Sequence, residues 1–284
     1  MSPPSFDRRL LRELFRFNAR LGPYRILKGI DYLRCVELPT FAAVLLERRT
    51  EPLAYLDVGS GDSILPTFIA THSAYHVTAI DRFTWVRAQA RYLRTLRKAE
   101  WLADGRFAIR EEDFVRATSL PDRTFDLVTA VSVVEHMDGD GDSEAVRKIF
   151  RLLKPGGRFL MSSPYNDRRA QDFFGPHAAY SAEPDARGIF FQRHYSAETL
   201  RHRLLEAAPF EIERVFYAGH YNRVNLFKRV WLVPRWLTPL KVFYNWGAAF
   251  YAPYFLQLSA TPPADPKPSV VTADTVFVFF RKPH

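Results

Sequence analysis

A short apolar segment that runs directly into two glycines constrains the fold of this chain more than any other feature. Residues 54–58 (Ala-Tyr-Leu-Asp-Val) are typical of a buried strand, and Gly59 and Gly61 follow at once. Ser63 can cap a helix whose first turn tolerates Pro66. The backbone N–H groups at such a helix N-terminus favour an anionic group. The sequence therefore predicts a strand–turn–helix unit that binds a phosphate or a carboxylate.

Apolar runs of strand length alternate with helical patterns through the middle of the chain. This alternation predicts an α/β fold in which helices cover both faces of a mostly parallel, Rossmann-like sheet. We expect seven strands, at 54–58, 76–80, 107–110, 125–131, 158–162, 210–217 and 275–280. Residues 1–50 are expected to form an N-terminal helical cap, and residues 51–284 the main domain.

Capping residues and glycine turns mark the ends of the expected helices. Thr84 and Ser196 are, like Ser63, candidate helix caps. The segment 143–153 carries an apolar stripe at helical spacing and is followed by Lys-Pro-Gly-Gly at 154–157, which is typical of a helix end before a strand.

The glycine turn alone is compatible with two kinds of nucleotide cofactor. A dinucleotide-binding fingerprint needs a third glycine three positions after Gly61, but Ile64 stands there. Asp81 ends the second expected strand, at the spacing of a carboxylate that binds ribose hydroxyls in either case. An NAD-linked oxidoreductase is therefore disfavoured but remains an alternative.

Further motifs follow in register and resemble class I S-adenosylmethionine-dependent methyltransferases. The first motif of that family, acidic-x-Gly-x-Gly, matches residues 57–61. The resemblance covers about residues 53–217 and the final strand. It continues through Asp113-Phe114, residues 120–128, Ser-Val-Val-Glu-His at 132–136, Leu-Leu-Lys-Pro-Gly-Gly at 152–157 and Arg-His-Tyr-Ser at 193–196.

The resemblance implies a binding site for S-adenosylmethionine. By analogy, Gly59 and Gly61 hold the methionine moiety, and Asp81 binds the ribose. Asp113 and Phe114 hold the adenine. The remaining residues predicted to bind the cofactor or to organise its loop are Asp57, Ser60, Arg82 and Ser132.

The same resemblance gives candidates for catalysis and for acceptor binding. Glu135 and His136 can form a general base, or they can stabilise a loop that closes over the cofactor. A similar loop in ubiquinone-pathway O-methyltransferases binds a divalent metal through an extra acidic residue, but Ser132 occupies that position, so no metal is predicted. The candidate acceptor-binding residues are Tyr165, His194 and Tyr195.

A basic, aromatic insertion at 220–270 precedes the last expected strand. The formal charge of the whole chain is +9, and no acidic residue lies between Arg214 and Ala264. The run 242–258 is uncharged but shorter than the roughly 20 residues of a spanning helix. We therefore expect residues 226–258 to contact an anionic membrane surface. A lid packed on the main domain is the second alternative, and RNA binding is the least favoured.

These features together predict methyl transfer to a small molecule, with an oxygen of a lipophilic or lipid-linked acceptor as the favoured target. A catalytically silent adaptor at a membrane is the competing alternative, beside the oxidoreductase. Cys35 is the only cysteine, which fits a reducing compartment. The expected location is the cytoplasm, including its membrane surface.

Overall fold

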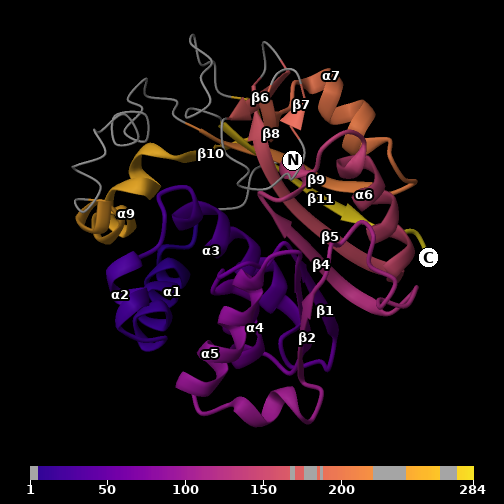
Figure 1. Ribbon diagram of the computed structural model, residues 1–284. Coiled ribbons are helices and arrows are strands. Elements are labelled where there is room, and N and C mark those ends of the chain that lie inside the picture. The colour runs from indigo at the N-terminus through magenta and orange to yellow at the C-terminus, as the bar shows by residue number, and fades with distance from the viewer. Residues whose placement is uncertain (1–5, 167–169, 176–183, 186–187, 220–240, 263–273) are drawn as a thin grey trace.

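An eight-stranded sheet forms the centre of the protein in the computed structural model (Figure 1). The structure describes residues 6–166, 170–175, 184–185, 188–219, 241–262 and 274–284. Across the sheet the strands are ordered β10-β9-β11-β5-β4-β1-β2-β3. They are β1 (Ala54–Val58), β2 (His76–Asp81), β3 (Phe107–Glu111), β4 (Phe125–Val131), β5 (Leu153–Tyr165), β9 (Glu211–Gly219), β10 (Gln257–Ser259) and β11 (Asp274–Arg281).

The direction of the chain through the sheet creates one point where neighbouring connections diverge. Strands β1 to β5 are parallel, and β11 is antiparallel to both β5 and β9. From β1 the chain proceeds outward to β2 and β3, then crosses back to add β4 on the other side of β1. In open α/β sheets, ligands bind at the carboxyl ends of the strands at such a switch point.

Helices cover both faces of the sheet, as the sequence predicts. The alternation of side chains along β1 sends Tyr55 to one core and Leu56 and Val58 to the other. Figure 1 shows α6 and α7 over one face, with α4, α5 and the N-terminal helices over the other. These helices are α1 (Arg8–Arg20), α2 (Pro23–Lys28), α3 (Arg34–Leu45), α4 (Leu65–His72), α5 (Ala88–Thr95), α6 (Gly141–Leu152) and α7 (Ala197–Leu200).

The predicted helix starts agree with the structure to different degrees. Ser196 caps α7, and its hydroxyl and that of Thr199 complete a reciprocal capping box. The Ser63 hydroxyl accepts the N–H of Leu65 at 3.2 Å, but the N-cap of α4 is Ile64 rather than the predicted Ser63. The expectation for Thr84 is wrong, because this residue begins a 3-10 turn, Thr84–Arg87, that precedes α5 and lacks a side-chain cap.

The predicted strand count is also wrong, since the sheet has eight strands rather than seven. The additional strand, β10, pairs antiparallel with β9. It has three residues and directly follows helix α9 (Lys241–Phe255), so it is too short for a period-two pattern. A small second sheet is formed by β6 (Gln171–Gly175), β7 (Pro184–Asp185) and β8 (Gly188–His194). The rest of the predicted insertion, 220–240 and 263–270, lies outside the described residues.

None of the helices in the described part of the chain has the length and hydropathy that crossing a bilayer requires.

Candidate cofactor and active site

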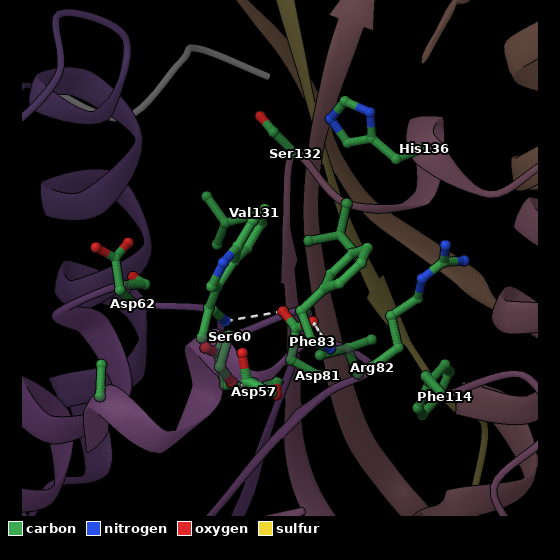
Figure 2. Close-up of a pocket in the computed structure, with 18 of the residues that line it drawn as sticks. Asp57, Ser60, Asp62, Asp81, Arg82, Phe83, Phe114, Val131, Ser132 and His136 are labelled. Atoms are coloured by element: carbon green, nitrogen blue, oxygen red, sulfur yellow. Dashed lines mark hydrogen bonds between the residues drawn. The ribbon is translucent and has the colours of Figure 1, made fainter. Parts of the chain in front are cut away.

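A cavity of about 1660 Å³ opens at the carboxyl ends of β1, β2 and β4, beside the switch point. Ligand sites commonly enclose about 300–1,000 Å³, so the cavity has room for a cofactor and an acceptor. Figure 2 shows Asp57 and Asp81 on one side of the cavity and Ser132 and His136 on the other. Residues of the glycine motif, of the end of β2 and of the 132–136 motif therefore line one cavity.

The two glycines after β1 are required for different reasons. Both adopt positive φ values, +66° at Gly59 and +45° at Gly61, which disfavour residues with a side chain. A Cβ atom on Gly59 would lie 2.4 Å from Cγ1 of Val133, so this glycine allows the loop after β4 to approach. A Cβ atom on Gly61 would meet only the Asp81 carboxylate, at 3.7 Å. The backbone at Gly61 thus faces open cavity.

Asp81 is oriented by the backbone of two loops. Its Oδ2 accepts the N–H of Gly61 at 2.9 Å, and its Oδ1 accepts the N–H of Phe83 at 2.9 Å. Burial raises the pKa of the carboxyl, and both N–H groups oppose that shift. A carboxylate has about four lone-pair sites, so it can accept two further hydrogen bonds. Asp81 is thereby suited to bind a pair of ribose hydroxyls.

Asp57 joins β1 to β4 beneath the glycine turn. Its carboxylate is buried and accepts the hydroxyls of Thr129, at 2.5 Å, and Tyr55, at 3.2 Å. Burial raises its pKa to about 6. The Ser60 hydroxyl donates to the Asp57 carbonyl oxygen at 2.7 Å, which fixes the turn itself. These contacts organise the loop that carries Gly59.

The predicted adenine residues lie at the wall of the same cavity. The Asp113 carboxylate accepts the N–H groups of Val115, at 3.0 Å, and Arg116, at 3.4 Å, and so shapes the turn after β3. Phe114 is mostly buried, yet it also lines the cavity. Arg82 lines it too, and its guanidinium lies 4.8 Å from the ring centroid of Phe83.

A buried carboxylate from the N-terminal helices connects the loop after β4 to strand β5, and the sequence did not predict it. Glu37 of α3 accepts the hydroxyls of Ser132, at 2.7 Å, and Ser162, at 2.8 Å. Its other oxygen accepts Arg34 at 2.6 Å, and Arg34 also donates to the carbonyl of Val131. The one available signal was an acidic residue inside the otherwise apolar stretch 35–46.

The N-terminal helices also supply part of the cavity wall, which was not predicted. Arg25 and Lys28 of α2 pair with Asp62, which directly follows the glycine turn. The hydroxyl of Tyr92 donates to the carbonyl of Asp62 at 3.0 Å. The two ion pairs hold α2 against the residue that follows Gly61. Helix α2 therefore forms the cavity wall on that side.

The structure separates the predicted Glu135–His136 pair. Glu135 is buried beneath the loop, where it accepts the hydroxyl of Ser163 at 3.1 Å. Burial raises its pKa to about 8, so the carboxyl is protonated at neutral pH. His136, in contrast, lines the cavity, and its Nε2 lies 3.9 Å from Glu135 Oε1. This distance is too long for a hydrogen bond.

His136 is held as a neutral imidazole of defined tautomer. Its Nδ1 lies 2.7 Å from the carbonyl oxygen of Phe191 in β8. A carbonyl oxygen can only accept, so Nδ1 carries the proton and Nε2 keeps its lone pair. Burial lowers the pKa of the ring to about 4. His136 therefore stays a neutral imidazole throughout the neutral pH range.

Tyr165, His194 and Tyr195 are each buried, and none of them is among the residues that line the cavity. The Tyr165 ring lies 4.9 Å from that of Tyr217. His194 packs on Phe173 at 4.4 Å, and burial lowers its pKa to about 4. These contacts do not support the predicted acceptor-binding role.

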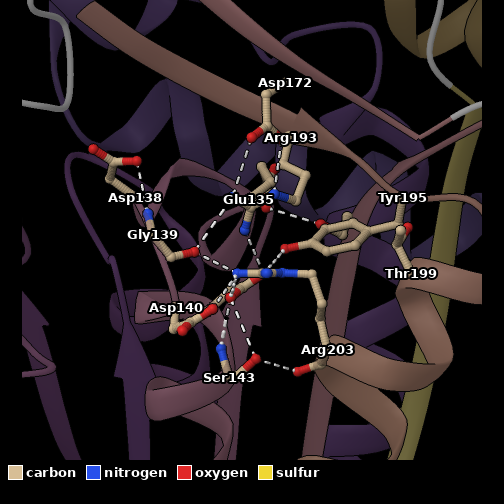
Figure 3. A network of polar contacts seen from close by, with 12 residues as sticks. Glu135, Asp138, Gly139, Asp140, Ser143, Asp172, Arg193, Tyr195, Thr199 and Arg203 are labelled. Atoms are coloured by element: carbon tan, nitrogen blue, oxygen red, sulfur yellow. Dashed lines mark hydrogen bonds and ion pairs between the residues drawn. The ribbon is translucent and has the colours of Figure 1, made fainter. Parts of the chain in front are cut away.

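Tyr195 belongs to a buried ionic network that holds β8 against α6. Figure 3 shows Arg193, Tyr195 and Arg203 converging on one region. All three donate to Asp142, with distances of 2.7–2.8 Å. Burial alone would raise the pKa of Asp142, but the two arginines and the tyrosine hydroxyl lower it. Because β8 also supplies the Phe191 carbonyl, this network positions the partner of His136.

The fold and the cavity define a Rossmann-like protein that binds a nucleotide cofactor, and comparison with known families specifies the class. Residues 7–215 match the family described as "Methyltransferase domain", so the chain belongs to this family. This confirms the predicted S-adenosylmethionine-dependent methyltransferase and its cofactor. It favours the methyltransferase over the oxidoreductase alternative. No curated protein matches the chain.

Two solved structures illustrate the shared fold. The cyclase SpnF is 19% identical, with 90% of this chain and 87% of that chain covered and a TM-score of 0.54. The 1,6-didemethyltoxoflavin-N1-methyltransferase of Burkholderia thailandensis was solved with 1,6-didemethyltoxoflavin and S-adenosylhomocysteine bound. It is 14% identical, with 96% of this chain and 82% of that chain covered and a TM-score of 0.50. At such identities the similarity shows the fold alone.

Removal of the Asp81 carboxylate is expected to weaken cofactor binding. Asp81→Ala should reduce the affinity for S-adenosylhomocysteine roughly 10- to 100-fold, as expected for the loss of charge-assisted hydrogen bonds. Titration calorimetry measures this directly. Glu111→Ala is the matched control, because Glu111 faces Asp81 on the neighbouring strand but pairs with Arg87. An Asp81→Ala protein that binds as tightly as the control would contradict the assignment.

The protonated state of Glu135 predicts a particular pH dependence of stability. The folded pKa is raised, so the stabilisation from this group is complete below about pH 4 and is lost as the pH rises towards 8. Glu135→Gln removes this titration. The difference in the free energy of unfolding between this variant and the wild type should therefore change in favour of the variant by about 1 kcal/mol per pH unit between about pH 5 and 8. Urea unfolding at several pH values tests this, and parallel pH profiles would rule it out.

The Asp142 network is expected to be a major determinant of stability. Asp142→Asn leaves the buried guanidinium of Arg193 and the partly exposed one of Arg203 without their shared charge, and should cost about 3–5 kcal/mol in the free energy of unfolding. Asp140→Asn is the control, because Asp140 also pairs with Arg203 but its side chain is 78% exposed. Chemical denaturation should place the control near wild type. Equal effects of the two substitutions would show that burial is not the cause.

Proposed function

We propose that the protein methylates a hydroxyl oxygen of a lipophilic small molecule, and that His136 receives the hydroxyl proton. The observation that carries this proposal is the position of His136, which lines the cavity as a neutral imidazole with Nδ1 bound to Phe191. An oxygen nucleophile must lose its proton during methyl transfer, whereas a neutral amine can attack without prior loss of one. A fixed base therefore favours oxygen as the target.

Apolar side chains in the cavity wall support an apolar acceptor. They come from α3, from the segment before it, from the end of β4 and from the residues that follow β4. These are Ile30, Leu38, Val131, Val133 and Met137. Such side chains favour an apolar body on the acceptor, while polar groups at a few points fix its orientation.

The chain's contribution to catalysis is mainly positioning. When bound, S-adenosylmethionine supplies a methyl group on a sulfonium, which is already activated for transfer. Gly59, Gly61 and Asp81 would hold this cofactor on one side of the cavity. His136 would orient the acceptor hydroxyl and take its proton at Nε2. Alignment of two reactants in one cavity can supply much of the rate acceleration.

Substitution of His136 should impair the methylation of oxygen but not of nitrogen. Candidate acceptors are screened as matched pairs, such as an alkylphenol and the corresponding alkylaniline. His136→Gln should lower kcat for the phenol about 100-fold or more and leave aniline methylation nearly unchanged. His72→Gln is the control, since Nδ1 of His72 also lies 2.8 Å from a backbone carbonyl oxygen, that of Phe68, but His72 does not line the cavity.

The pH profile separates a base from a residue that only shapes the cavity. Because the pKa of His136 is about 4, the wild-type rate should stay level down to about pH 5 rather than fall near the usual histidine value of about 6.5. The His136→Gln rate should rise with pH as the phenol ionises in solution. Level profiles in both proteins would contradict the proposed base. Absence of turnover with every acceptor, despite cofactor binding, would favour the catalytically silent adaptor.

A further inference from the structure

Helix α9 exposes a row of aromatic side chains. Phe243, Trp246, Phe250 and Tyr254 recur every three or four residues, so they share one face of the helix. Their exposed fractions are 66%, 43%, 87% and 63%. Large apolar side chains grouped in this way on a surface commonly mark an interaction site.

The opposite face of α9 is already packed against the protein. Ala248 and Ala252 are fully buried, and the ring of Tyr251 stacks on that of Tyr32, with 5.7 Å between the ring centroids. Within the described residues, the aromatic row is therefore an outer surface of the protein. A partner that binds it must come from outside this part of the chain.

Helix α2 extends the aromatic row. Tyr24, Ile26 and Leu27 are 60%, 44% and 55% exposed. The two helices are joined directly, because the indole N–H of Trp246 donates to the carbonyl of Ile26 at 2.5 Å and Asn245 donates to that of Lys28 at 2.8 Å. Figure 1 also shows α2 and α9 side by side. We call these seven exposed side chains of α2 and α9 the α2–α9 patch.

We infer that the α2–α9 patch docks on the surface of an anionic membrane. Charge supports this inference. Helix α1 packs against both α2 and α9, and its outer face is basic, with Glu13 as the single acidic residue of the helix. The exposed arginines of α1 are Arg8, Arg9, Arg12, Arg16 and Arg20. Aromatic side chains beside arginines match the boundary between acyl chains and anionic headgroups.

The same charge argues against a second copy of this chain as the partner. Two patches facing each other would bring two basic α1 helices together, and the chain as a whole carries a formal charge of +9. Like charges across an interface disfavour association. An anionic lipid surface, in contrast, is attracted by every exposed arginine near it.

The α2–α9 patch is continuous with the cavity. Tyr24 belongs to the patch and also lines the cavity, together with Lys28 from the end of α2. A docked α2 would therefore place one wall of the cavity next to the membrane. This step rests on the proposed function, because it gives a lipophilic acceptor a short route from the bilayer to His136.

Vesicle sedimentation tests the docking without any methylation assay. The full-length protein is mixed with vesicles of phosphatidylcholine alone and of phosphatidylcholine with about one third phosphatidylglycerol. Phe243→Ala/Phe250→Ala removes two exposed rings from the patch. The matched control is Leu102→Ala/Ile212→Ala, two exposed apolar residues outside the patch. Calorimetry with S-adenosylhomocysteine verifies that all three proteins are folded.

We expect the wild type and the control to sediment with anionic vesicles, and the patch variant to bind at least about tenfold more weakly. Binding should weaken severalfold as sodium chloride rises from about 0.1 to 0.5 M. Equal binding of the patch variant, equal binding to neutral vesicles, or no binding at low salt would overturn the inference. So would a wild-type dimer that the patch substitutions dissociate. Vesicle binding without methylation of hydroxyl acceptors would contradict the proposed function alone.

Discussion

The site depends on the burial of one carboxylate, that of Glu37. A buried charge is costly unless donors surround it, and here Arg34, Ser132 and Ser162 supply those donors. These partners come from α3, from the loop after β4 and from strand β5. The hydrogen bonds of the Glu37 carboxylate therefore hold α3 against β5 and the loop that carries His136. They fix the position of this helix, which forms part of the cavity wall.

Burial acts in opposite directions on the two adjacent residues of the loop after β4. It raises the pKa of Glu135 and lowers that of His136, so both side chains are uncharged at neutral pH. This matters for a cofactor that carries a positive charge. A protonated imidazole lining the same cavity would repel the sulfonium, whereas a neutral one does not. The burial that makes His136 a weak base therefore also avoids charge repulsion between its ring and the cofactor sulfonium.

Local sequence patterns were enough to predict the strands up to β5 and to place Asp57, Gly61 and Asp81 at one edge of the sheet. The strands up to β5 are apolar runs bounded by turn residues, and Asp57, Gly61 and Asp81 lie where such strands end. The ends of parallel strands share one edge of a sheet, so the order of the motifs already placed these residues together. The eighth strand was missed because three residues after a helix carry no periodic signal.

Contacts between distant segments explain what the sequence did not predict. Glu37 lies 95 positions before Ser132, and no local pattern connects the two. Tyr195 belongs to a motif that resembles the family, but its hydroxyl donates to Asp142 and its ring is fully buried. The motif position was informative about the fold, since Ser196 does cap α7. It was not informative about the direction of the neighbouring side chain.

The N-terminal helices connect the inner and outer features of the protein. Glu37 of α3 fixes the loop after β4, Lys28 of α2 closes the cavity beside Asp62, and the outer side of α2 continues into the α2–α9 patch. Helix α2 therefore belongs both to the outer patch and to the cavity wall. Docking of the patch would place this wall at the membrane surface. The sheet supplies the cofactor side of the cavity, and the helical layer supplies the side that an acceptor from the membrane would meet.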